Sequence, residues 1–99
     1  MTRLRTRLRP AKMLTETGRF VRDCAVTDRT GRGARLRFFE PTELPERFVL
    51  YEERDASRRP VRTIWSAGAE AGVRFEGPAE IVDAAERERI AGRYYAVQD

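Results

Sequence analysis

The chain has 99 residues with 20 basic and 16 acidic side chains, a net charge of +4, and every basic residue except Lys12 is an arginine. This length predicts one small domain, and the absence of histidine excludes histidine-based triads, histidine general bases and most catalytic zinc sites that one chain can supply. A single cysteine, Cys24, excludes an intramolecular disulfide. No apolar run approaches the ~20 residues of a membrane span, and the N-terminus lacks the apolar core of a secretory signal. We therefore expect a cytoplasmic protein without membrane insertion.

The first ten residues are expected to form a flexible basic arm. Arginine stands at every second position from residue 3, and this period of two favours an extended segment with its arginines on one side. Pro10 argues against a continuing helix. The arm is either a solvated, frayed terminus or a clamp for an anion. Its arginines are Arg3, Arg5, Arg7 and Arg9.

Six short strands are predicted after the arm, with turn signals roughly every ten residues. The alternation is clearest in residues 34–38, where Ala34, Leu36 and Phe38 are interleaved with Arg35 and Arg37. This pattern predicts a strand with one buried and one solvent-exposed face. This spacing is typical of a small β-barrel or sandwich. The predicted strands cover residues 11–15, 20–27, 34–38, 48–51, 61–65 and 71–75.

A polar loop, residues 28–33, connects the second and third of these strands. Its two glycines let the backbone turn and leave room for a close approach. Asp28 and Thr30 stand two residues apart, a common self-capping pattern for a turn, while Arg29 and Arg32 supply further donors. On this chemistry the loop is either an ordinary tight turn or a recognition loop.

The periodicity changes to that of a helix after Gly77 and Pro78. We expect a C-terminal helix within residues 77–99 that packs across the strands and plugs one end or covers an edge. Its buried stripe would comprise Val82, Ala85, Ile90, Tyr94 and Val97.

Two single residues in the predicted strands are expected to be buried. Cys24 is interpreted as a small buried hydrophobe. Trp65 is expected in the core, as a lone tryptophan in a strand usually is, and the alternative is an aromatic ring that stacks on a bound base.

The order of these elements resembles that of the PilZ domain, a bacterial receptor module for cyclic di-GMP. The arm contains the Arg-x-x-x-Arg motif of that family in two overlapping registers, Arg3 with Arg7 and Arg5 with Arg9. The loop 28–33 is similar to the family motif Asp/Asn-x-Ser-x-x-Gly, with Thr30 where the family usually has serine. The hairpin 61–68 leading into residues 72–75 looks like the last barrel hairpin of short stand-alone members.

The resemblance implies a mainly β fold: a small six-stranded antiparallel PilZ-like barrel over residues 11–76, preceded by the arm and followed by the C-terminal helix. It also implies that the arm folds over the barrel beside the loop, so that both motifs form one cyclic di-GMP site. The ligand-binding residues would be Arg3, Arg5, Arg7, Arg9, Asp28, Arg29, Thr30 and Gly33, with most weight on Arg5, Arg9, Asp28 and Thr30.

The chemistry of these residue types suits cyclic di-GMP. Arginine can donate two hydrogen bonds to O6 and N7 of guanine, a bidentate contact that discriminates against other bases by about 1–3 kcal/mol. It can also pair with phosphate and stack on bases. Asp28 can accept hydrogen bonds from the guanine N1–H and N2 amine, and Thr30 can donate to a phosphate. Gly33 would let the backbone lie against the ligand.

A regulatory role is expected rather than an enzymatic one, because no carboxylate pair is placed for acid–base chemistry and no phosphate-binding P-loop occurs. No cofactor or metal is expected besides the nucleotide. The resemblance implies a protein effector in motility, pilus, chemotaxis or exopolysaccharide systems. One alternative is a degenerate PilZ interaction module without nucleotide binding. Another is a basic nucleic-acid-binding barrel, which the scattered acidic residues and the lack of an aromatic platform disfavour.

Overall fold

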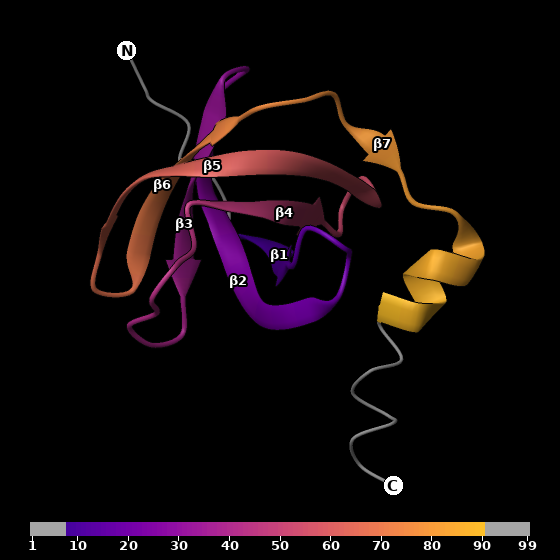
Figure 1. The fold of residues 1–99 in the computed structure, drawn as a ribbon, viewed down its shortest axis with the longest axis horizontal. Coiled ribbons are helices and arrows are strands. Elements are labelled where there is room, and N and C mark those ends of the chain that lie inside the picture. Colours follow the sequence, from indigo (N-terminus) through magenta and orange to yellow (C-terminus); the bar gives the residue numbers. More distant parts are fainter. Residues whose placement is uncertain (1–7, 91–99) are drawn as a thin grey trace, which may run out of the picture.

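A computed structural model describes residues 8–90, in which six antiparallel strands close into a barrel (Figure 1). Around the sheet the order is β4-β1-β2-β3-β6-β5-β7, and an additional pairing of β4 with β5 closes the barrel. The predicted mainly β, six-stranded antiparallel barrel is therefore confirmed, and β7 is an added edge strand. The strands are β1 Arg9–Leu14, β2 Phe20–Arg29, β3 Gly33–Phe38, β4 Arg47–Glu52, β5 Ser57–Ala67, β6 Glu70–Phe75 and β7 Glu80–Ile81.

The barrel interior is filled by alternate side chains of all six barrel strands. This alternation follows from the two-residue period of a strand, which turns every second side chain inward. Cys24 lies in this core, 5% exposed, as predicted. The core residues are Ala11, Met13, Cys24, Val26, Leu36, Phe38, Phe48, Leu50, Val61, Ala71 and Val73.

The loop between β2 and β3 is shorter than the sequence predicted. Strand pairing continues to Arg29, which faces Ala34, so Asp28, Arg29 and Gly33 all belong to strands. The turn is closed by a backbone hydrogen bond of 2.9 Å from the Thr30 N–H to the Gly33 carbonyl. The β2–β3 register shifts between Val26 and Asp28, and such an irregularity re-aims the side chains that follow it.

The C-terminal segment covers the outer face of β1 and β4. Val82 and Ile90 are nearly fully buried and pack against Leu14 and Tyr51. The helical residues 84–90 start after Asp83, whose Oδ1 accepts a 2.8 Å hydrogen bond from the Glu86 N–H and so caps the helix. The helix lies at the opposite end of the long axis from the β5–β6 hairpin (Figure 1).

Two details of the predicted helix are wrong. It begins at residue 84, because residues 80–81 form β7 against β5. Ala85, expected in the buried stripe, is exposed because Val82 and Ile90 make the contacts with the barrel. The predicted stripe residues Tyr94 and Val97 lie outside the described residues. Within residues 8–90 no helix is long and apolar enough to cross a membrane.

Candidate ligand-binding site

A pocket of about 300 Å³ opens beside the β2–β3 turn. Its walls come from the end of β2, the start of β3 and the adjacent β5–β6 hairpin. Four of the predicted ligand-binding residues meet here, namely Asp28, Arg29, Thr30 and Gly33. The pocket is also lined by Arg32, Ala34, Arg35, Ile64, Trp65, Gly72, Val73 and Arg74, which the list of predicted ligand-binding residues did not include.

The side chains of the turn already hold its backbone in place. Thr30 Oγ1 accepts hydrogen bonds from the N–H groups of Arg32 and Gly33, at 3.1 and 3.3 Å, and its own hydroxyl proton is left for another acceptor. Asp28 Oδ1 accepts a bond of 2.9 Å from the Arg29 N–H. The Arg32 carbonyl accepts a 2.8 Å bond from Phe75 N–H and ties the turn to β6. The loop is thus a capped, anchored turn that presents one rim of the pocket.

Gly33 is required by the packing of the sheet. A Cβ built on Gly33 would lie 2.1 Å from the Val73 carbonyl oxygen of β6. The sequence analysis explained this glycine by the room that it leaves for a ligand. In the structure, a side chain at residue 33 would collide with the backbone of β6. Strands β3 and β6 approach each other closely at this residue, because no side chain stands between them.

Trp65 forms one wall of the pocket, so its predicted place in the core is wrong. Its side chain is 40% exposed, and that of the preceding Ile64 is 55% exposed. The β5–β6 register shifts between Thr63 and Trp65, which breaks the inward alternation begun at Val61. The indole covers Gly72 on the neighbouring strand, where a Cβ would lie 2.2 Å from the indole Nε1. A glycine on the strand facing an aromatic residue is the sequence signal that could have indicated this pair.

The pocket is rich in arginines that have no carboxylate partner in the described part of the chain. Arg32, Arg35 and Arg74 form no ion pair there, and the Arg35 guanidinium lies 5.8 Å from the centre of the Trp65 ring. By contrast, many arginines outside the pocket are paired, such as Arg62 with Glu76 at 2.8 Å. Unpaired guanidinium groups next to an exposed aromatic ring suit a ligand with both phosphate and a planar base.

Arg29 is one of the residues that line the pocket, but its guanidinium group is bound to Glu52 and packed on Phe75. Its Nε and Nη2 donate to the two carboxylate oxygens of Glu52, at 2.8 and 3.1 Å, and its guanidinium lies 5.0 Å from the centre of the Phe75 ring. The hydrogen bond to Glu52 raises the pKa of Arg29, so this side chain stays charged. The structure therefore supports Arg29 as a residue of the pocket wall rather than as a free phosphate donor.

The arm joins the barrel close to the pocket. Arg9 is the first residue of β1 and pairs with Val26 of β2, two residues before Asp28. The chain therefore enters the barrel alongside the strand that carries the Asp28 motif. The other predicted arm residues, Arg3, Arg5 and Arg7, lie outside the described residues.

No group of three or more residues that could hold a metal ion occurs between residues 8 and 90. Comparison of the chain with models of protein families, with curated proteins and with solved structures found no match. The resemblance to the PilZ family stays a prediction.

Proposed function

We propose that this chain is a PilZ-like receptor module that binds cyclic di-GMP and relays the level of this second messenger to a partner protein. One observation carries the proposal. The Asp28–Gly33 motif borders a pocket whose remaining walls bring together an exposed tryptophan and three arginines without carboxylate partners among the described residues.

Each part of the pocket suits one part of the ligand. Trp65 offers an exposed aromatic face on which a guanine can stack. Asp28 uses Oδ1 within the turn, which leaves Oδ2 to accept from the N1–H and N2 amine of guanine. Arg35 and Arg74 supply guanidinium groups for phosphate. A volume of about 300 Å³ is at the small end for ligand sites, so the pocket accommodates one base and its phosphate. We assign the remainder of the ligand to Arg5 of the arm and to Arg9, which the structure places at the start of β1.

The degenerate module is the second candidate, and the hydrogen bonds of the turn favour it. Asp28 and Thr30 both accept from backbone N–H groups of their own loop, as they would in a turn with no ligand. On this reading the barrel surface binds its partner constitutively. A partner pulldown that is unchanged by cyclic di-GMP, together with no heat on titration, would favour it.

Isothermal titration with cyclic di-GMP tests the proposal. Saturable heat at micromolar ligand is expected for the wild type, with a loss in the Asp28→Ala and the Arg5→Ala/Arg9→Ala variants. Absence of heat from the wild type would remove the nucleotide-binding function. A gel-shift with DNA and RNA at low salt tests the nucleic-acid alternative, which predicts steeply salt-dependent binding.

A further inference from the structure

Polar side chains face the interior at the end of the barrel where β2 and β4 finish and β5 begins. Glu52, the last residue of β4, stands opposite Ser57, the first residue of β5, and also opposite Ala11 of the core. Arg59 stands opposite Leu50, another core residue. Directly opposed residues of antiparallel strands project from the same face, so Glu52, Ser57 and Arg59 point into this end of the barrel.

The carboxylate of Glu52 is occupied by Arg29 at this end. Glu52 is 6% exposed, and each of its two oxygens accepts a hydrogen bond from the Arg29 guanidinium. This hydrogen bond raises the pKa of Arg29, and the charge of Asp55 in the β4–β5 turn adds to the shift. Asp55 is exposed, however, and forms no ion pair with the described residues. Neither acid therefore pairs with Arg59.

Arg59 carries a buried hydrogen-bond donor that no described residue satisfies. Its guanidinium lies 4.3 Å from the centre of the Phe75 ring, which packs against the core. Among residues 8–90, Arg59 Nε is the only buried side-chain nitrogen or oxygen atom without a hydrogen-bond partner. A buried donor on a charged group is costly unless an acceptor reaches it. An anion that enters this end of the barrel would supply that acceptor.

Ser57 places a second donor beside Arg59. It precedes Arg59 by two residues on the same face of β5, which separates their Cα atoms by about 7 Å. Ser57 is 6% exposed, and its hydroxyl makes no hydrogen bond to a described residue. The oxygens of a phosphate group point in tetrahedral directions, so different oxygens can accept from the guanidinium and from the hydroxyl.

We propose that Ser57 and Arg59 form a binding site for one phosphate group at this end of the barrel. The ligand is either inorganic phosphate or the phosphate of a small phosphomonoester. The end is open to such an anion, because Arg59 is half-buried and the Arg29 side chain at the rim is 29% exposed.

This site is separate from the pocket on the outer face of the sheet. Arg35 and Trp65 of that pocket lie in register with Gly72, which alternates with the core residues Ala71 and Val73 of β6. Ser57 and Arg59 do not line the pocket. The inference therefore goes beyond the proposed function and does not depend on it.

The test follows the arginine Nε–H signals in ¹H–¹⁵N NMR spectra while inorganic phosphate or glycerol phosphate is added to the wild type. The Arg59 signal, assigned by its loss in Arg59→Lys, should shift and saturate at about millimolar ligand. A response to inorganic phosphate alone identifies the free anion, and a tighter response to glycerol phosphate identifies a phosphomonoester; both support the site. No shift of the Arg59 signal with either compound would overturn the proposal.

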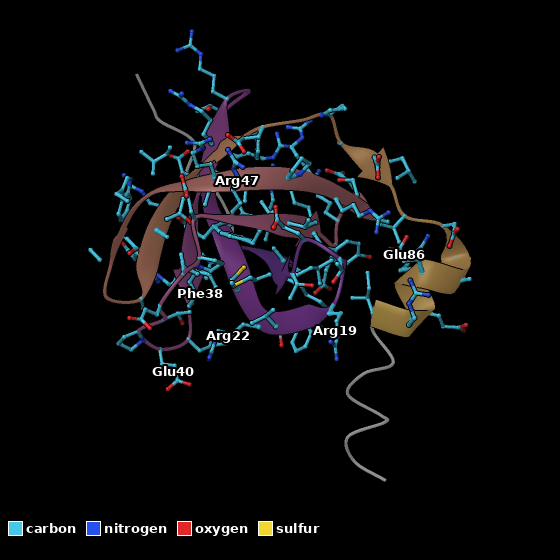
Figure 2. The ribbon with its side chains drawn as sticks, in the orientation of Figure 1. Arg19, Arg22, Phe38, Glu40, Arg47 and Glu86 are labelled. Atoms are coloured by element: carbon cyan, nitrogen blue, oxygen red, sulfur yellow. The ribbon has the colours of Figure 1, made fainter. Side chains whose placement is uncertain are left out.

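Arg19 is the internal control in the same spectra. Figure 2 shows Arg19 on the β1–β2 hairpin, where its side chain is exposed. This hairpin joins the end of β1 to the start of β2, so it lies at the other end of the barrel from Arg59. The Arg19 Nε–H signal, assigned by its loss in Arg19→Lys, should not saturate with phosphate. Equal shifts of the two signals would mean that phosphate acts only through general charge screening, and the site would be refuted.

Ser57→Ala tests the second donor. The variant removes only the hydroxyl, so the Arg59 signal should need about tenfold more phosphate to reach half of its shift. A midpoint equal to that of the wild type would overturn the two-donor site. The wild-type titration still decides the proposal if circular dichroism shows that this variant does not fold.

The affinity of Arg59→Lys for cyclic di-GMP separates this site from the proposed nucleotide site. It should equal that of the wild type, because Arg59 does not line the outer-face pocket. A loss of about tenfold or more would place Arg59 in the nucleotide site and would overturn the proposal of a separate one. If the wild type fails to bind cyclic di-GMP, the proposed function falls, whereas the phosphate titration still decides the role of Ser57 and Arg59.

Discussion

The indole of Trp65 occupies the space that a side chain at Gly72 would fill, since a Cβ at residue 72 would lie 2.2 Å from the indole Nε1. Gly72→Ala must therefore displace the tryptophan from the pocket wall. If Trp65 stacks on a base, cyclic di-GMP affinity should fall by about 10- to 100-fold, the range expected for one lost stacking contact.

Tryptophan fluorescence provides the second readout for this variant, because Trp65 is the single tryptophan of the chain. Its emission should shift in Gly72→Ala and should be quenched by ligand in the wild type. Gly31→Ala is the control: a Cβ there meets no atom within 4 Å, so emission and affinity should stay as in the wild type. A Gly72→Ala protein with wild-type affinity would exclude stacking on Trp65.

Gly33→Ala should destabilise the fold itself. The added methyl group would collide with the Val73 backbone carbonyl at 2.1 Å, and a backbone atom cannot rotate away as the end of a side chain can. We expect a loss of about 1–3 kcal/mol in the free energy of unfolding, measured in urea. Stability equal to that of Gly31→Ala would contradict the close approach of β3 and β6.

Docking of the C-terminal segment depends on Ile90. This side chain is 3% exposed in the cluster with Leu14, Tyr51 and Val82, whereas Ile81 is 75% exposed. Ile90→Ala should cost about 2–5 kcal/mol in the free energy of unfolding. The same substitution at Ile81 should change it by no more than about 0.5 kcal/mol. Equal effects at the two positions in chemical denaturation would argue against the observed packing of residues 84–90.

Burial of Cys24 predicts a pH dependence of stability. Desolvation raises the pKa of its thiol to about 12, from an ordinary value near 9. Between these values the unfolded chain loses the proton while the folded chain keeps it, so the free energy of unfolding should fall as the pH rises. The decline should be smaller in Cys24→Ala. The native thiol should also resist a thiol reagent at pH 8, and rapid modification of the folded protein would contradict its burial.

The fold was predictable because its main signal is local. The alternation of Ala34, Leu36 and Phe38 with two arginines shows which side of β3 faces the core, and Cys24 follows from the same rule. The two-residue strand β7 is too short to carry such a signal.

The candidate site was predictable only in part. The motif indicated Asp28 and Thr30, but register shifts in β2 and β5 change which side chains reach the pocket. For this reason Trp65 was expected in the core, and its place beside the pocket was only the alternative. The partner of Arg29 lies 23 residues away, on a strand that does not adjoin β2, and no local pattern indicates such a pair.

The most direct test of the account is a titration of the wild type and of Arg5→Ala/Arg9→Ala with cyclic di-GMP. The account predicts saturable micromolar binding to the wild type and a loss of at least about tenfold in the double variant, because each arginine is expected to contribute a charge-assisted contact. Circular dichroism should show the same β-rich fold for both proteins. No binding to the wild type, or equal binding to both proteins, would contradict the central claim that the arm and the Asp28 loop form one nucleotide site.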